Sequence, residues 1–259
     1  MDDAIAIVSV LERADRAAEL PRLGGMARPD GIAIVSEQRW AFARVDGGTQ
    51  VFITPHGPSY FRRVPVLRGL VKLGVSLAPM LNKSGGAPRR DKVILAVALI
   101  VPVAAALLPH SISLALSIST AVAMVAWVLR GRTLFLHGAE HRAIAAAEER
   151  SLVATWHGVA RPTRFSRRCG TNFAALLVPV TLALDHIWFL PGAALAPLMI
   201  VPLSLGLTME LWQAIQGRTG SGARLLLVPG LALQRLTTRE PTLAETRVAL
   251  RALAAVLDA

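Results

Sequence analysis

Two long stretches of the chain are almost free of charged residues. No Asp, Glu, Lys or Arg occurs in the 37 residues from Val93 to Leu129, and a single membrane-spanning helix needs only about 20 apolar residues. Pro109–Ser111 interrupts the run at mid-length, where a turn is expected. The pattern therefore predicts a hairpin of two transmembrane helices, Val93–Leu108 and Ile112–Leu129.

A second hairpin is predicted further along the chain. Two apolar segments, Asn172–Phe189 and Ala193–Leu211, flank the turn signal Leu190–Gly192. Asp185 and Glu210 stand near helix ends, where water and headgroups reach them. Buried core hairpins of a soluble protein are the alternative, but two hairpins of this length with so little charge favour four membrane crossings.

The composition fits this interpretation and adds an orientation. Hydrophobic residues make up 53% of the 259 residues, whereas the net charge is +11. Lys and Arg number 14 in residues 1–92, 8 in residues 130–171 and 6 in residues 212–259. By the positive-inside rule, these segments and both termini face the cytoplasm. We therefore expect a multi-pass protein of the bacterial inner membrane whose basic residues contact anionic headgroups of the lipid bilayer, and no binding of nucleic acid.

The charged segments predict a small cytoplasmic cap that contains both helices and strands. Asp46–Gly48 supplies a hairpin turn between two of three short strands. Val64–Leu81 is apolar but carries Arg68, so we expect a helix lying on the inner membrane surface. Thr242, with Glu245 three residues on, forms a capping box that starts a final helix. The three expected strands are Gly31–Ser36, Trp40–Val45 and Gln50–Thr54.

The expected fold class follows from these segments. It is a mainly α membrane protein with four transmembrane helices arranged as two hairpins, under a small α+β cytoplasmic cap built from the N-terminal, middle and C-terminal segments. The five parts are the N-terminal segment 1–92, hairpin one 93–129, the middle loop 130–171, hairpin two 172–211 and the C-terminal segment 212–259.

The sequence His137-Gly138-Ala139-Glu140-His141 carries the candidate chemistry. On a helix, residues four apart share a face, so His137 and His141 can direct both imidazoles at one ion. Glu148 lies two turns beyond His141 on that face. The order H-x-x-E-H is that of the inverted zinc-peptidase motif, in which the histidines bind zinc and the glutamate moves a proton of water. The spacing alone is equally compatible with an amphipathic helix whose polar side chains are solvated or paired with arginines.

Further blocks accompany this motif in a fixed order. His137–His141 is followed by Arg142, and Arg168–Thr171 is followed by Phe173. They resemble the blocks H-G-A-E-H-K and H-P-R-C-G-T-x-F of the YqhQ-like family of bacterial membrane proteins, a family of unknown function described as predicted metal-dependent enzymes. The resemblance extends from about Gly24 to the C-terminus and implies a metal-dependent activity on an unknown substrate. The other matching positions are Pro65–Gly69, Glu148, Pro229–Leu231, Gln234 and Leu236–Pro241.

The chain departs from the family pattern in two places. Asp30 replaces the glutamate of the block G-G-Q-A-V-x-E-G, and Ser166 and Arg167 replace the His and Pro that precede R-C-G-T. If that glutamate or histidine binds metal in the family, this chain has a shortened or missing ligand. His157 lies in the same loop and could substitute.

The resemblance adds Cys169 to the candidate ligands. In a reducing cytoplasm its thiolate could bind a metal or act as a nucleophile, although a lone cysteine at a helix start is more often a packing residue. Arg168 and Arg239 could bind an anionic substrate group or lipid phosphates. The expected site consists of His137, His141, Glu148 and Cys169 around a divalent metal, best zinc, with Glu140 as general base and with Asp30, Arg168, Thr171, Arg239 and Glu240 as further candidates.

Two functions therefore stay open. The first is a metal-dependent hydrolase whose site lies at the cytoplasmic membrane face and acts on a peptide or lipid-linked substrate. The second is a non-catalytic membrane scaffold or assembly factor, which the departures at Asp30 and Ser166 favour. Both are compatible with a homo-oligomer.

Overall fold

The computed structural model describes residues 2–55, 59–77, 88–105, 131–187, 196–216, 218 and 220–258, with short stretches between 108 and 123. The chain folds into two compact, discontinuous units. Unit 1 comprises residues 1–55, 129–169 and 231–259, and unit 2 comprises residues 56–128 and 170–230.

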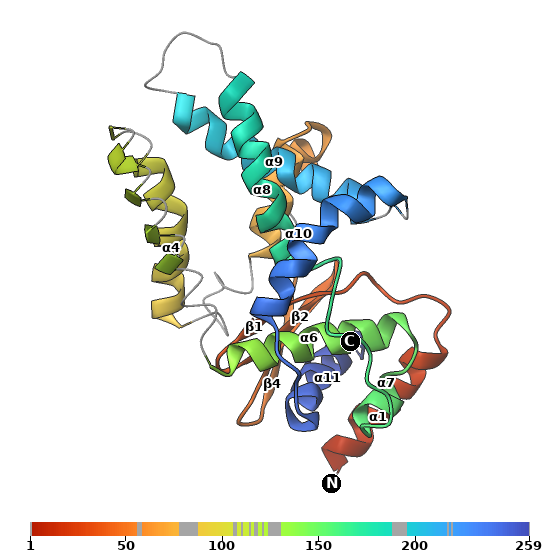
Figure 1. Cartoon of the computed structure of the whole chain (residues 1–259). Coiled ribbons are helices and arrows are strands. Elements are labelled where there is room, and N and C mark those ends of the chain that lie inside the picture. Colours follow the sequence, from red (N-terminus) through yellow and green to blue (C-terminus); the bar gives the residue numbers. More distant parts are fainter. Residues whose placement is uncertain are drawn as a thin grey trace. The chain divides into compact units, whose positions relative to one another are not determined.

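Unit 1 contains a four-stranded antiparallel sheet in the order β1-β2-β3-β4 (Figure 1). Short turns join consecutive strands, and the positive φ angles of Gly47 and Gly48 form the turn between β3 and β4. Three of the strands confirm the sequence prediction, whereas β1 was not predicted. The strands are β1 (Gly24–Arg28), β2 (Gly31–Val35), β3 (Arg39–Arg44) and β4 (Thr49–Ile53).

Helices cover one face of this sheet. Alternation in β2 and β3 points Ile32, Ile34, Ala41 and Ala43 toward that face, where they join the main core cluster. α11 packs against β2, β3 and α6, and α1 packs against α7 and α11 (Figure 1). The helices of unit 1 are α1 (Asp2–Arg16), α6 (Thr133–Glu148), α7 (Leu152–Trp156) and α11 (Leu243–Leu257).

The opposite face of the sheet has a small aromatic cluster. Trp40 stacks on Phe52 with ring centroids 4.2 Å apart, and Ala33 and Phe42 are buried beside them. The guanidinium of Arg28 lies 4.2 Å from the centroid of the Phe42 ring. Both faces of β2 and β3 are therefore buried, which places these two strands at the centre of unit 1.

The predicted capping box at the start of α11 is confirmed. The Thr242 hydroxyl accepts a hydrogen bond from the Glu245 backbone N–H (3.3 Å), and the Glu245 carboxylate accepts one from the Thr242 N–H (2.8 Å). We expect Thr242→Ala to lower the free energy of unfolding in urea by about 1 kcal/mol. Thr49→Ala, at the exposed start of β4, serves as the control and should stay within about 0.5 kcal/mol of the natural protein. Equal effects of the two substitutions would contradict a stabilising cap.

Unit 2 is helical in its described part. Gly69 and Gly206 let α2 and α9 pack closely, because a Cβ added at Gly69 would lie 2.3 Å from the Gly206 carbonyl oxygen. Next to this crossing, both carboxylate oxygens of Glu210 accept hydrogen bonds from the Arg68 guanidinium. The elements are η1 (Ser59–Arg63), α2 (Leu67–Ser76), α4 (Arg89–Ala105), α8 (Gly170–Ile187), α9 (Ala196–Gln216) and α10 (Ser221–Thr237), the last of which ends in unit 1.

The structure corrects the expected membrane topology. Among the helices of the described ranges only α8 is both long and apolar enough to cross a bilayer, and one such helix is weak evidence of a span. The expectation of four transmembrane helices in two hairpins, and with it of a multi-pass inner-membrane protein with both termini cytoplasmic, is therefore wrong. The fold is instead α+β, with a four-stranded sheet as the centre of unit 1.

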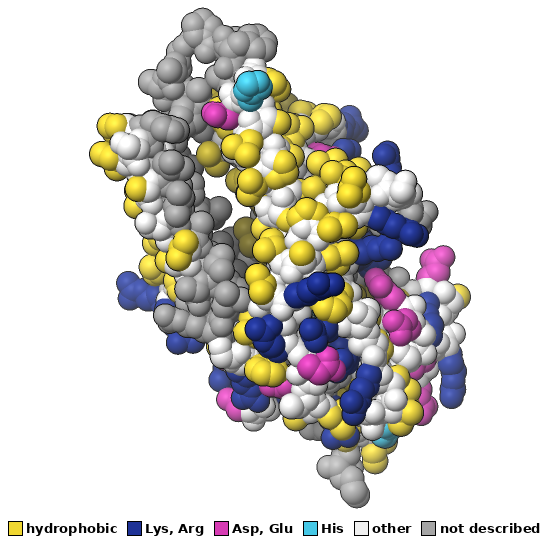
Figure 2. Space-filling model, viewed as in Figure 1, with side chains coloured by type: hydrophobic (Ala, Val, Ile, Leu, Met, Phe, Trp, Pro, Cys, Tyr) yellow, Lys and Arg dark blue, Asp and Glu magenta, His cyan; other side chains and the backbone are white. Residues whose placement is uncertain are grey.

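The error has a physical cause. A run without charges is not by itself a continuous helix of bilayer length. α4 has 17 residues and begins with charged side chains at Arg89–Lys92, and α9 contains Pro202 and Glu210. Hydrophobic side chains are exposed along α8 and α10 (Figure 2). Most of the expected helix 112–129 and the expected turn 190–192 lie outside the described residues.

Candidate metal centre

α6 carries the H-x-x-E-H motif through the middle of unit 1 (Figure 1). Its alanines at 139, 143 and 146 are fully buried, and their small side chains let α6 lie close to α11. One turn of the same helix directs His137 and His141 to the opposite side, where the segment 164–169 passes. His141 is 1% exposed and Glu140 is 4% exposed. The motif is therefore part of the folded interior and not a solvated helix face.

Three potential ligand atoms converge beside α6. The nitrogen and sulfur atoms offered by His137, His141 and Cys169 all lie within 4.8 Å of one another. His137 Nε2 is 3.2 Å from Cys169 Sγ, and the two imidazole rings meet edge to face with centroids 4.4 Å apart. The structure thus brings together the two histidines and the cysteine that the sequence proposed as ligands.

Hydrogen bonds to backbone carbonyls orient both imidazoles. His137 Nδ1 lies 2.8 Å from the Thr237 carbonyl oxygen, and His141 Nδ1 lies 2.6 Å from the Arg164 carbonyl oxygen. A carbonyl oxygen only accepts, so each Nδ1 carries a proton, and in the neutral form of each imidazole Nε2 keeps its lone pair. The Nε2 of His141 is buried and has no hydrogen-bond partner in the described part of the chain. Ligating histidines are held in this way in metal sites.

The segment Leu236–Pro241 places the Thr237 carbonyl. The Arg239 N–H donates to the Leu134 carbonyl (2.9 Å), and the Arg239 carbonyl presses against Gly138, where an added Cβ would lie 2.1 Å from that oxygen. The glycine of H-G-A-E-H is therefore required by a close backbone approach. In the sequence this block stands out only by resemblance, which carries no information on its structural role.

Glu240 holds the same segment in place through two arginines. The buried Arg142 donates to Glu240 (2.5 Å) and to the Pro162 carbonyl (3.0 Å), and Arg164 donates to the other oxygen of Glu240 (3.2 Å). The hydrogen bond from Arg142 is the main cause that lowers the pKa of Glu240, and the positive charges of Arg142 and Arg164 lower it further. Because the Arg164 carbonyl orients His141, this network of Glu240, Arg142 and Arg164 helps to hold the His141 imidazole in place.

Glu140 is a buried acid next to the histidines. Burial raises its pKa from 4.5 to about 7, and the nearby charge of His137 partly opposes that rise. Its side chain packs on Gly25 of β1, where an added Cβ would lie 2.6 Å from the Glu140 Cγ. The glycine pair before Met26 had no assigned role in the sequence; its second member makes room for this carboxyl group.

The other predicted site residues lie outside the cluster of three. Glu148 is exposed and forms an ion pair with Arg168 at 3.0 Å. Asp30 receives two hydrogen bonds from Arg28, at 3.0 and 2.7 Å. The Arg239 guanidinium donates to the backbone carbonyls of residues 235 and 238. Thr171 is the second residue of α8 and belongs to unit 2.

The two positions that depart from the family pattern have structural partners. At Ser166, the backbone N–H and carbonyl pair with the buried amide of Gln234, at 2.8 and 2.7 Å. Asp30 stands at the turn between β1 and β2 with Arg28. Gln234 therefore fixes the loop that leads to Cys169, a role that its place in a matching block had not revealed.

These features define an α+β protein with a buried cluster of two histidines and one cysteine. A model of the family described as protein of unknown function (DUF1385) matches residues 102–259, and the chain belongs to this family. The resemblance found in the sequence is thereby confirmed, whereas the metal-dependent activity attached to it is not supported by this match.

One curated relative is the uncharacterized protein YqhQ of Bacillus subtilis (strain 168). It is 32% identical over 126 residues, which make up 46% of this chain and 38% of the relative. The match thus spans less than half of the relative's length. No solved structure matches the chain.

Proposed function

We propose that His137, His141 and Cys169 bind one divalent metal ion, for which zinc is the most suitable candidate. We further propose that the protein is a metal-dependent hydrolase. The observation that carries the proposal is the convergence of the three ligand atoms around a buried His141 Nε2 without a hydrogen-bond partner among the described residues. A buried polar atom left unpaired costs about 1–3 kcal/mol, and a metal ion would remove that cost.

The donor set fits zinc. Imidazole nitrogen and thiolate sulfur are the ligands that zinc prefers, and the preset lone pairs on both Nε2 atoms suit a common ion. The 3.2 Å between His137 Nε2 and Cys169 Sγ is close to the about 3.5 Å that tetrahedral bonding to zinc requires. Three protein ligands leave a fourth position open, as in catalytic sites. A zinc ion held there would supply a Lewis acid.

Glu140 supports a hydrolytic reaction. A general base works best when its pKa is near the operating pH, and that of Glu140 is about 7. In the proposed step the oxygen of water attacks the substrate carbonyl carbon while Glu140 takes the proton. The bond from carbon to the leaving nitrogen or oxygen then breaks, and Glu140 returns the proton to the leaving group.

Metal analysis of the purified chain tests the proposal. We expect one zinc ion per chain in the natural protein and a loss of affinity of at least about 100-fold in His141→Ala. His157→Ala is the matched control, because His157 is exposed at the end of α7, and it should bind zinc as the natural protein does. Replacing zinc by cobalt should give a sulfur-to-cobalt absorption band that Cys169→Ser abolishes.

Three outcomes would contradict the proposed centre. They are the absence of stoichiometric transition metal in the natural protein, unchanged metal content in His141→Ala, and an unchanged cobalt spectrum in Cys169→Ser. A loss of metal in His157→Ala but not in His141→Ala would move the centre to the loop that contains His157.

A further inference from the structure

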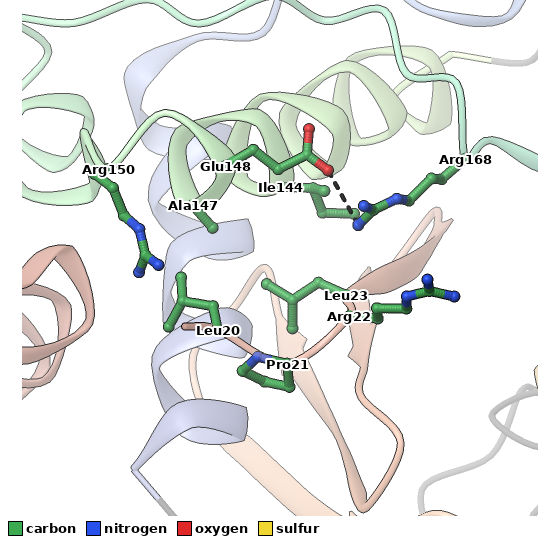
Figure 3. Close-up of a pocket in the computed structure, with 9 residues that line it drawn as sticks. All are labelled: Leu20, Pro21, Arg22, Leu23, Ile144, Ala147, Glu148, Arg150 and Arg168. Atoms are coloured by element: carbon green, nitrogen blue, oxygen red, sulfur yellow. Dashed lines mark ion pairs between the residues drawn. The ribbon is translucent and has the colours of Figure 1, made fainter. Parts of the chain in front are cut away.

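A pocket of about 230 Å³ lies within unit 1 along the C-terminal half of α6 (Figure 3). One wall is α6, which contributes Ile144 and Glu148, and the facing wall is the segment before β1, which contributes Leu20 and Leu23. Figure 3 shows Arg150 at one end of the pocket and Arg22 and Arg168 at the other. The pocket therefore combines an apolar floor with basic ends.

Two elements connect the pocket to the centre. Ile144 and Glu148 lie three and seven residues after His141, so they continue the helix face that carries the histidines. Arg168, which lines the pocket, directly precedes Cys169 in the chain. The pocket thus lies on the two segments that carry His141 and Cys169, about one to two helical turns beyond His141 on α6.

The charges of the lining favour an anion. The lining contains three arginines and a single carboxylate, that of Glu148, which pairs with Arg168. Arg150 is already bonded to the Ala14 and Ala18 carbonyls, whereas Arg22 is exposed and has no ion pair in the described residues. The pair between Arg168 and Glu148 is substantially exposed, so it contributes at most about 1 kcal/mol and is easily exchanged for a ligand anion.

The size and the apolar floor define the rest of the ligand. The volume corresponds to roughly eight water-sized units of about 30 Å³, comparable to a short hydrocarbon chain. Leu20, Leu23 and Ile144 offer such a chain apolar contact without polar groups that need partners.

We propose that this pocket binds the substrate of the metal centre, and that the substrate is an anionic amphiphile: a short hydrocarbon segment that carries a carboxylate or a phosphate. Arg168 and Arg22 bind the anionic group, and the leucines and Ile144 hold the hydrocarbon. The reaction at the bound ligand rests on the proposed function, whereas binding itself does not require the metal.

Calorimetric titration of the full chain with octanoate, octyl phosphate and octanol, each below the concentration at which it forms micelles, tests this proposal. We expect one site per chain for at least one of the two anions, with octanol at least about tenfold weaker, a difference of about 1.4 kcal/mol. The double variant Arg22→Gln/Arg168→Gln should weaken the anion at least tenfold. Arg16→Gln, on the exposed surface of α1, is the matched control and should bind as the natural protein does.

The variant Glu148→Gln tests the direction in which anion affinity changes. Removing the carboxylate that competes for Arg168 should tighten binding of the anion, whereas a structural role of the ion pair would predict no change or weaker binding. Preference for octanoate or octyl phosphate assigns the headgroup. Equal affinity for octanol, no binding of either anion, or unchanged binding in the double arginine variant would overturn the proposal.

The same titration on zinc-free and zinc-loaded protein separates this proposal from the proposed function. Anion binding without any zinc binding would leave the pocket intact and remove the hydrolase. Stoichiometric zinc without anion binding would leave the centre intact and remove the assigned substrate class.

Discussion

Gly138→Ala is expected to lower the free energy of unfolding by about 3 kcal/mol. The added Cβ would lie 2.1 Å from the Arg239 carbonyl oxygen and 3.3 Å from Cδ of Pro241. Both neighbours belong to a segment whose backbone is bonded to α6, so neither relaxes as a flexible side chain would. Equilibrium urea unfolding followed by circular dichroism measures the loss.

The same substitution should weaken zinc binding, because moving Arg239 displaces the nearby Thr237 carbonyl that orients His137. Gly74→Ala is the matched control. Gly74 lies in α2, and among the described residues nothing lies within 4 Å of a Cβ added there, so alanine should be neutral or stabilise by up to about 1 kcal/mol. A Gly138→Ala protein within about 1 kcal/mol of the natural one, with intact zinc affinity, would show that the close approach is not required.

Glu140 should make the stability of the metal-free protein fall as the pH rises. Its pKa is raised in the folded state, so between pH 4.5 and about 7 the folded chain binds more protons than the unfolded chain. The stabilising difference is present below pH 4.5 and is lost by about pH 7. The shift corresponds to about 3 kcal/mol over this interval, which urea unfolding at a series of pH values measures.

Glu140→Gln should remove this pH dependence and leave a protein that is more stable than the natural one above pH 7. Bound zinc should also flatten the profile, because a nearby cation favours the carboxylate form of Glu140. Glu149→Gln is the control at the exposed end of α6 and should keep the natural profile. If the free energy of unfolding of Glu140→Gln still falls as the pH rises, a group other than Glu140 causes the pH dependence.

The same variant separates the two functions that the sequence left open. A hydrolase requires Glu140 as base, so stably folded Glu140→Gln should lose its activity while it still binds zinc. A scaffold would keep its function in the cell with glutamine at this position. Loss of function in a folded, zinc-binding variant would therefore exclude the scaffold.

Local patterns predicted much of unit 1. The alternation in residues 31–54 and the Gly47-Gly48 turn gave three strands, and Thr242 with Glu245 gave the start of α11. The strand Gly24–Arg28 was missed, because two glycines and no alternation carry little strand signal. It forms because β2 offers an edge with which it pairs in register.

The candidate site was predicted in part. Helical spacing brought His137 and His141 together, and resemblance added Cys169. Spacing also put Glu148 on the same face of the helix. The segment 164–169, which supplies Cys169, contacts α6 near His137 and His141. Glu148 instead pairs with Arg168 at the surface. The orienting carbonyls of residues 164 and 237 have no side-chain signature, so no pattern could have found them.

The position of α11 in the chain has a consequence for synthesis. α11 packs on β2, β3 and α6 in the middle of the core, yet it follows β3 by roughly 200 residues, or about 10–40 s at the usual 5–20 residues per second on the ribosome. During that time the core of unit 1 lacks α11, although α6, which contacts β1 and β2, is made about 100 residues earlier. Unit 1 therefore completes its core only after α11 has been made, and the proposed metal centre would gain its full packing only at that stage.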